Sequence, residues 1–505
     1  MSWSEKWASY RRQQYSTLPL GLFRIVYGLC LLLEIWQLLD KYELIFSSVP
    51  FQVSGEVPMR PALVLWAVVC IAIIFGAWTR TALAINFALT VVFFGSTEQF
   101  EYHIDYIYSI INLLLLFVPL ESALSVDAKL DPAVRRPFAS RAGFDAILLT
   151  ALVSIYFESS IYKWAADTWV SGLGFWRPAS TPGFTVIDIG PFLDLKWLML
   201  GLGFMTLIFE TVFIVLMFFQ RLRWPLIAIG LGLHLGICFV FPIPIFGLAV
   251  AALYLLFVPD PFWRRLAQRW TDGQLSEENE RAAERAMAER PQRLRFYAIT
   301  TVVVTFFLLQ GIYMLRSPLA DWVTRTAGIG DTSQSSLQAA QDSSLGQTFK
   351  IFSRGYFGAA TRGLFVDQHF DGIDRAKTLV EVDEDGEWIW LPMMDSASRF
   401  RRGWTGRLWV WWYFRVSSPK VDFEDFNDRI LRATAWWIGE HPRDTPRRRF
   451  LVIAKPYPSI DISDGWQKGR YDQLTAPPWQ PVASVTWVDG VARIQHFPPG
   501  GGPDA

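Results

Sequence analysis

A lysine at the end of a long apolar segment is the side chain whose position could support chemistry. Lys163 closes the apolar run 143–163 and is followed by Trp164 and Trp169. A lysine at the centre of a membrane helix costs roughly 2.5–3.5 kcal/mol, and far less near a helix end. Two interpretations follow from the local residues. Lys163 is either an interfacial anchor at the headgroup level, or a partly desolvated amine whose neutral form acts as a base.

Two histidines and two serines are candidates for a site shared with Lys163. His103 opens another apolar segment on the same side of the membrane, so we expect it at the level of Lys163. Ser159 and Ser160 precede the lysine by four and three residues and therefore share its helix face. His234 is expected near mid-membrane. The alternatives are an interfacial histidine, serines bonded to their own helix carbonyls, and a packed core histidine.

Two acidic residues also fall inside apolar segments. Glu34 lies toward the outer end of the first segment, and Glu210 lies in the segment 197–219. Ionisable residues within membrane helices are functional candidates. Glu210 is about 13 residues from the outer end, or roughly 20 Å by helical rise. This depth predicts that Glu210 does not pair directly with Lys163.

The composition is that of a membrane protein with an additional water-soluble region. The chain has 505 residues, of which 52% are hydrophobic, with 24 Trp and 39 Phe. A net charge of zero argues against nucleic acid as a partner. Apolar runs occur at 18–39, 61–78, 82–97, 105–121, 143–163, 197–219, 224–241, 243–258 and 296–315. These runs predict an α-helical polytopic domain of about nine spans in a lipid bilayer.

Basic residues are confined to alternate loops between these runs. Arg80, the cluster at 129–141, the pair at 221–223 and the cluster at 264–269 all fall on one side, together with the basic N-terminus. The opposite loops are acidic or sparsely charged. The positive-inside rule therefore predicts a multi-pass protein of the cell membrane with its N-terminus in the cytoplasm and its C-terminal domain outside.

The C-terminal region predicts a mostly β domain with one covering helix. Turn signals at 383–386 and 489–490 indicate two hairpins, 408–416 and 450–455 are expected as further strands, and 423–440 has helical spacing. The acidic segment 367–374 matches no standard ligand spacing, so no metal site is predicted. The expected organisation is a cytoplasmic N-terminus (1–15), a transmembrane domain (16–265), a charged cytoplasmic helix (266–295), a last span (296–316), a linker (317–346), the extracytoplasmic β-rich domain (347–498) and a tail (499–505).

Four segments of the membrane region resemble a known family. They are LGLFRIVYG at 20–28, PLESALSVD at 119–127, Lys163 with WVSG at 169–172, and His234 with Pro259-Asp260. Together they resemble the horizontally transferred transmembrane (HTTM) domain over residues 16–265, as a bacterial-type member. That family includes the vitamin K-dependent gamma-glutamyl carboxylases, which are quinone-dependent lyases.

The resemblance implies a reaction and assigns residues to it. Lys163 matches the family's catalytic lysine with a one-residue gap, and His103 matches its assisting histidine with a small offset. The cofactor would be a reduced, vitamin K-like quinone, deprotonated by Lys163 and bound by the residues His234, Ser159, Ser160 and Trp169. Its oxygenation would provide the base for carboxylation of a glutamate in an extracytoplasmic peptide or protein. The alternative is a non-catalytic membrane module that binds a lipid or a peptide through its outer domain.

Overall fold

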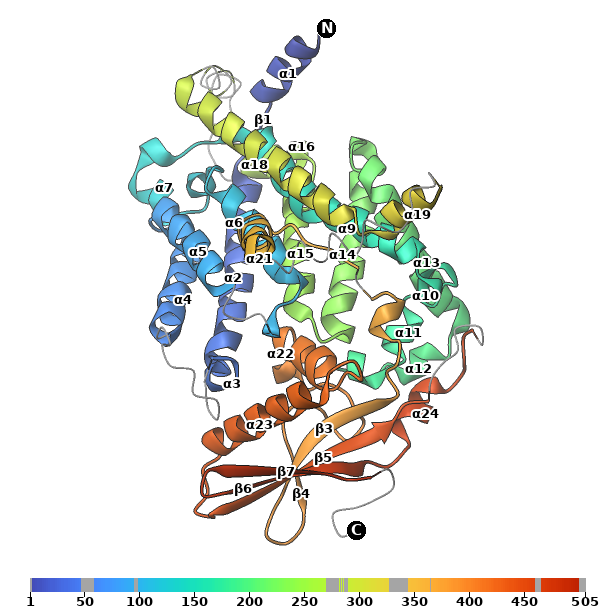
Figure 1. Cartoon of the computed structure of the whole chain (residues 1–505). Helices are drawn as coiled ribbons and strands as arrows, with labels where there is room; N and C mark the ends of the chain where they lie inside the picture. The colour runs from blue at the N-terminus through green and yellow to red at the C-terminus, as the bar shows by residue number, and fades with distance from the viewer. Residues whose placement is uncertain are drawn as a thin grey trace.

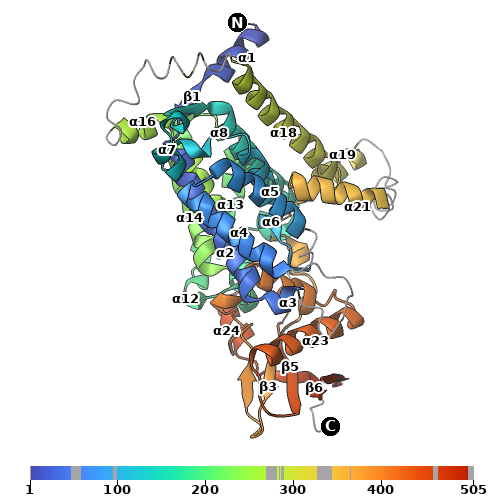
Figure 2. The same cartoon turned by 90° about the vertical axis from the view of Figure 1, so that its left-hand side faces the viewer.

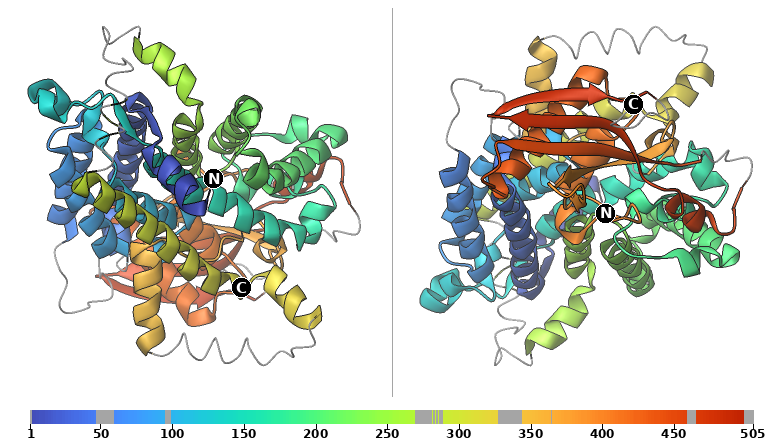
Figure 3. Two further views of the ribbon diagram at one scale, coloured as in Figure 1. Left: turned by 90° about the horizontal axis from the view of Figure 1, so that it is seen from above. Right: turned by 90° about the horizontal axis from the view of Figure 1, so that it is seen from below.

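The two ends of the molecule are built differently. The computed structural model describes residues 2–46, 59–94, 99–268, 281, 283, 285, 289–326, 344–363, 365–458 and 465–498. Helices form the end that carries the N-terminus, and a β sheet forms the opposite end, close to the C-terminus (Figure 1). Seen from below, the strands lie across the ends of the helices (Figure 3).

Five helical segments are long and apolar enough to cross a membrane. They are α2 (Leu18–Asp40), Arg141–Trp164, α13 (Lys196–Leu216), α14 (Arg223–Val240) with the turn before it, and α18 (Arg290–Met314). A sixth results if α15 (Pro244–Phe257) and α16 (Asp260–Gln268), bent by 80°, count as one span. The shorter apolar helices are α4 (Met59–Phe75), α5 (Thr79–Phe94) and α6 (His103–Leu115). The chain is thus a multi-pass membrane protein, with five to six of the predicted spans confirmed.

The segment Arg141–Trp164 consists of three consecutive pieces, α8 (Arg141–Ile147), η4 (Leu148–Val153) and α9 (Ser154–Trp164). The middle piece is a π-helical turn, a feature that often marks functional sites. The shorter helices elsewhere are α1 (Trp3–Arg12), α3 (Tyr42–Phe46), α7 (Val126–Leu130), α10 (Asp167–Val170), α11 (Trp176–Ala179), α12 (Gly190–Leu193), α19 (Pro318–Thr326), α21 (Ser344–Lys350) and α24 (Arg470–Thr475). Of these, α21 projects sideways from the helical region (Figure 2).

The sheet has five antiparallel strands in the order β4-β3-β5-β6-β7. The strands are β3 (Arg375–Val382), β4 (Trp388–Trp390), β5 (Arg447–Pro456), β6 (Gln480–Val488) and β7 (Val491–His496). Both predicted hairpins are present. In the second, Asp489 and Gly490 have φ values of 50° and 78°, as a two-residue hairpin turn requires. A separate small pair joins β1 (Gln14–Ser16) to β2 (Phe138–Ser140).

The strand expected at 408–416 is wrong. This stretch forms α22 (Arg407–Val410) and the π-helical turn η10 (Trp411–Val416). This helical stretch lies between the sheet and the helical region, and its aromatic side chains are buried on several of its sides. The many aromatic residues therefore reflect burial of a helix, although the same composition is typical of a strand. The following helix α23 (Phe423–Glu440) contacts the sheet through Trp437, whose indole donates to Glu381 of β3 over 2.9 Å.

Residues 351–363 pack among the membrane helices before the chain reaches the sheet. The η7 turn (Ile351–Tyr356) lies against α6, and the Tyr313 and Ser353 hydroxyls of α18 and η7 are 2.8 Å apart. Gly358, at φ 65°, has no room for a side chain, because a Cβ there would lie 1.8 Å from the carbonyl oxygen of Tyr106. This segment therefore belongs to the helical core.

A buried arginine joins the sheet-side helices to the membrane helices. Arg407 of α22 forms ion pairs with Glu34 of α2, at 3.2 Å, and with Asp105 of α6. The Tyr102 hydroxyl donates to the second oxygen of Glu34 over 2.5 Å. The two carboxylates thus share one guanidinium, which lies 373 residues from Glu34 in the chain.

We expect Arg407→Met to lower the free energy of unfolding by ~3–5 kcal/mol, because it leaves two carboxylates without their cation in a buried position. Thermal unfolding of the purified protein in detergent measures the change. Arg402→Met, at an exposed neighbouring position, is the matched control and should change little. Adding Glu34→Gln to Arg407→Met should recover part of the loss. Equal melting temperatures for Arg407→Met and the control would contradict the role of this arginine.

Candidate functional site

Lys163 is buried inside the helical region and paired with a carboxylate. It occupies the last turn of α9, is 4% exposed, and donates from Nζ to Oε1 of Glu210 over 2.5 Å. The prediction that Glu210 does not pair with Lys163 is therefore wrong. The ammonium also lies 4.3 Å from the ring centroid of Trp169. A lysine in this position is not an exposed interfacial anchor.

The pairing arises because the chain after α9 packs beside α13 and does not leave the helical region at once. Gly172 and Gly203 meet so closely that a Cβ on Gly203 would lie 2.2 Å from the Gly172 carbonyl oxygen. The indole of Trp164 donates to Thr211 of α13 over 2.9 Å. The end of α9 therefore lies level with Glu210, far along α13. The sequence prediction estimates the depth of Glu210 by counting residues from the end of its apolar run. That estimate is wrong because it assumes that residues 165–195 form a loop outside the membrane.

His234 belongs to a hydrogen-bonded chain next to the ion pair. Its Nε2 is 2.7 Å from the hydroxyl of Tyr156 on α9, which is 2.7 Å from the hydroxyl of Tyr254 on α15. Gly230 makes room for this chain, since a Cβ there would lie 1.8 Å from the Tyr254 hydroxyl. Tyr156, the partner of His234, lies seven residues before Lys163 on α9, so the two side chains lie on the same face of this helix. Lys163 and His234 are thus brought together, with two tyrosines that the sequence did not single out.

The two serines do not bind Lys163 in this arrangement. The Ser160 hydroxyl donates to the carbonyl of Phe157 in its own helix over 2.8 Å. This is the alternative in which the serines bond to carbonyls of their own helix. The Ser159 hydroxyl is buried and makes no hydrogen bond with any described residue. Trp169 is held firmly, since its indole donates to the carbonyl of Phe365 over 2.7 Å.

His103 lies in the wall of a cavity of about 350 Å³ on the sheet side of the site. Its Nδ1 is buried and makes no hydrogen bond with any described residue. His369 lies in the same wall, and burial lowers the pKa of His369, so its ring is neutral at pH 7. The described lining residues are Glu101, Tyr102, His103, Tyr106, Ile243, Phe246, Arg354, Ala360, Thr361, Phe365, His369, Trp409, Val410, Phe414 and Arg415.

Lys163 and His234 are one side chain away from this cavity and are not among its described lining residues. Phe365 lines the cavity and binds Trp169, which covers the lysine. Phe246 also lines the cavity, and its ring centroid is 6.3 Å from that of His234. The predicted residues thus form two adjacent groups, an ion pair with a histidine–tyrosine chain and a cavity that holds His103.

The acidic segment that follows Phe365 has a structural role. Asp367 accepts hydrogen bonds from the backbone N–H of Asp167, at 2.7 Å, and of Thr168, at 3.1 Å, at the start of α10. It also pairs with Arg177 at 3.3 Å. Among the residues that the structure describes, no group of three or more His, Cys, Asp or Glu side chains could hold a metal ion.

A buried polar centre inside a bundle of membrane helices defines this chain as an integral membrane protein with a candidate internal site. The family model for the HTTM domain matches residues 10–263, half of the chain, and the chain therefore belongs to the HTTM-domain family. This confirms the family resemblance of the sequence. Neither the curated proteins nor the solved structures include a significant match.

Lys163 and Glu210 should be energetically coupled. We expect Lys163→Met alone to lower the free energy of unfolding by ~3–5 kcal/mol, because Glu210 is left buried without its cation. The double variant Lys163→Met/Glu210→Gln should be less destabilised than the sum of the single variants by about 1–3 kcal/mol. Chemical or thermal unfolding in detergent measures all three. Lys196→Met, at an exposed position at the start of α13, is the control. Strict additivity would show that the pair does not form.

Proposed function

We propose that this protein is a quinone-dependent membrane enzyme related to the vitamin K-dependent gamma-glutamyl carboxylases. It would couple oxidation of a reduced quinone to modification of a peptide or protein on the sheet side of the membrane. The observation that carries the proposal is the buried Lys163–Glu210 pair, beside a histidine–tyrosine chain and next to an aromatic cavity. Ionisable groups at such depth are costly and are commonly functional.

The cavity that contains His103 suits a quinone ring. Its volume of about 350 Å³ is in the range of small-molecule pockets, which are mostly apolar with a few polar groups. The rings of Phe365, Trp409 and Phe414 supply the apolar wall. The free Nδ1 of His103 supplies a hydrogen-bonding partner for a quinone oxygen. A reduced quinone would supply two electrons and, with oxygen, the strong base needed to remove a carbon-bound proton.

The residues of the chain would hold and move the proton. Lys163 and Glu210 carry no net charge as a pair, whether their shared proton resides on the amine or on the carboxyl. A proton accepted from the reduced quinone would leave the pair with one positive charge, opposite the quinone anion formed in the same step. The chain of Tyr156, His234 and Tyr254 offers a hydrogen-bonded route beside it. A base must come within hydrogen-bond reach of its proton. Direct transfer to Lys163 therefore requires the wall formed by Trp169 and Phe365 to open.

The topology forms part of the proposal. If the bent pair α15 and α16 is one span, the six long spans and the three shorter apolar helices are consistent with nine crossings, in which α4, α5 and α6 also span the bilayer. The distribution of basic residues supports a cytoplasmic N-terminus and an extracytoplasmic sheet, with α23 as its covering helix. The substrate would then reach the His103 cavity from the outer side.

Replacement of Lys163 tests the enzymatic role. We expect Lys163→Ala to abolish oxidation of an added reduced naphthoquinone by the purified protein, followed by absorbance under air, with a loss of about 10²-fold or more. Lys163→Arg keeps the positive charge but cannot act as a base, so it should be equally inactive. Lys163→Arg also retains the cation opposite Glu210 and so controls for the loss of the ion pair. Activities are compared at equal amounts of folded protein.

Equal activity of Lys163→Ala, Lys163→Arg and the unaltered protein would remove Lys163 from the reaction. Organic extraction of the purified protein adds a second readout, because a quinone-dependent enzyme should retain a quinone. Absence of both bound quinone and quinone oxidation would favour a non-catalytic module that binds a lipid or a peptide through its sheet region.

Labelling in intact cells tests the proposed orientation. Glu384→Cys, in the exposed turn between β3 and β4, should react with a membrane-impermeant maleimide. Glu5→Cys, exposed in α1, should react only after permeabilisation. Of the three native cysteines, Cys30 and Cys70 are buried and Cys238 is partly buried, so the protein without an added cysteine measures the background. The reverse labelling pattern would invert the topology.

A further inference from the structure

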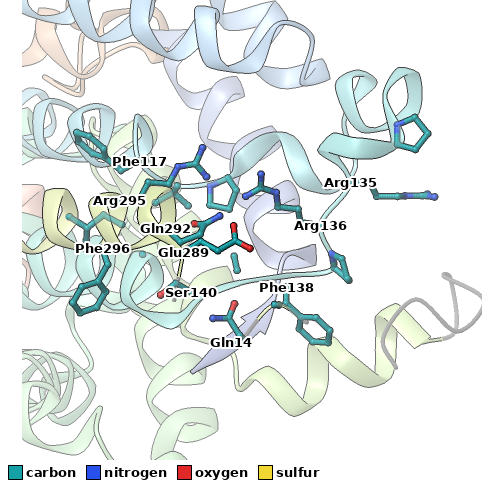
Figure 4. A pocket seen from close by; sticks show the side chains of 18 residues that line it. Gln14, Phe117, Arg135, Arg136, Phe138, Ser140, Glu289, Gln292, Arg295 and Phe296 are labelled. Atoms are coloured by element: carbon teal, nitrogen blue, oxygen red, sulfur yellow. The ribbon is translucent and has the colours of Figure 1, made fainter. Parts of the chain in front are cut away.

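A second cavity lies at the opposite end of the helical region from the sheet. Its volume is about 540 Å³, and it is enclosed by the N-terminal part of α18, the start of α8 and the segment 132–140 (Figure 4). Both helices begin here and run into the membrane region. The cavity is therefore placed at the level where lipid headgroups meet a membrane protein.

Three arginines are among the described residues that line this cavity. The guanidinium groups of Arg136 and Arg295 point toward each other, whereas Arg135 extends farther out (Figure 4). Arg80 and Arg136 repel Arg295 electrostatically, and Glu121 attracts it. None of the three lining guanidinium groups forms a hydrogen bond or ion pair in the described part of the chain. Glu289 is the only acidic residue among the described lining residues. The described lining residues thus carry an excess of two positive charges.

The walls around the arginines are apolar. Phe117, which follows α6, lines the same cavity. Phe296 and Ile299 line it from α18, which continues toward the membrane interior. A neighbouring cavity of about 790 Å³ shares Arg135 and Arg136 with the first. Its own wall includes Leu18, Ile25, Ile74 and Phe75. A soluble anion would use only the charged part of this arrangement, whereas a lipid would use both parts.

We propose that Arg136 and Arg295 bind the phosphate group of an anionic phospholipid whose acyl chains lie along these apolar walls. Basic pockets between membrane helices recognise lipid phosphates through charge and guanidinium hydrogen bonds. Gln14 and Gln292, which also line the cavity, add donors for the headgroup. The site is separate from the His103 cavity and does not depend on the proposed reaction.

Native mass spectrometry of the full-length protein in detergent tests this proposal with phosphatidylglycerol and phosphatidylcholine as competing probes. The unaltered protein should retain phosphatidylglycerol preferentially. At ~1 kcal/mol per basic residue, Arg136→Gln/Arg295→Gln should lower that preference roughly thirtyfold. Arg293→Gln, at an exposed position on α18 outside the cavity, is the matched control and should keep it.

A variant without the negative charge of Glu289 should bind the anionic lipid more strongly. Glu289→Gln should increase the retention of phosphatidylglycerol, a result that misfolding cannot produce. Inorganic phosphate is the soluble arm of the test and should not displace the lipid at millimolar concentration. Displacement by phosphate, equal retention of both lipids, or equal losses in the double variant and in Arg293→Gln would overturn the proposal.

Discussion

A charge buried among membrane helices requires a partner, and this requirement organises the molecule. Lys163 is paired with Glu210, Arg407 with Glu34 and Asp105, and Glu158 accepts a hydrogen bond from the backbone of Arg362. Each of these pairs links segments that are distant in the chain. Because an unpaired buried charge is strongly destabilising, these contacts restrict how the helices and the sheet region can be arranged.

Two segments fold back into the helical region and create its polar interior. Residues 165–195 extend along α13 and bring the end of α9 to the level of Glu210. Residues 351–363 and 365–370 form the second segment. Gln310 of α18 donates to the carbonyl of Ala360 over 2.9 Å and to Glu158 of α9 over 2.6 Å, and Asp367 binds the start of α10. Together they enclose Trp169 and Phe365, which separate the ion pair from the His103 cavity. The candidate site thus depends on both irregular segments more than on the spans themselves.

The sequence predicts which segments form helices and hairpins more accurately than it predicts how deep their residues lie in the membrane. Apolar length and turn chemistry identify the long helices and both hairpins, because these signals are local. The Lys163–Glu210 pair is missed, because its formation depends on how 165–195 packs. Tyr156 and Tyr254 carry no signal of their own, since tyrosines are common in such helices. His369 lies in a polar segment whose acidic residues match no metal-ligand spacing, and Asp367 of this segment holds the start of α10. The composition of the aromatic run 408–416 fits a strand, and only the structure shows that the run is a helix buried on several sides.

The most direct test is a cryo-electron microscopy map of the protein in lipid nanodiscs with an added reduced naphthoquinone. The account predicts ring-shaped density in the cavity lined by Phe365 and Trp409, within hydrogen-bond reach of Nδ1 of His103. It also predicts Lys163 in contact with Glu210 or turned from it toward the ring. A cavity without density at saturating quinone, or a Lys163 ammonium that faces the lipid headgroups, would contradict it.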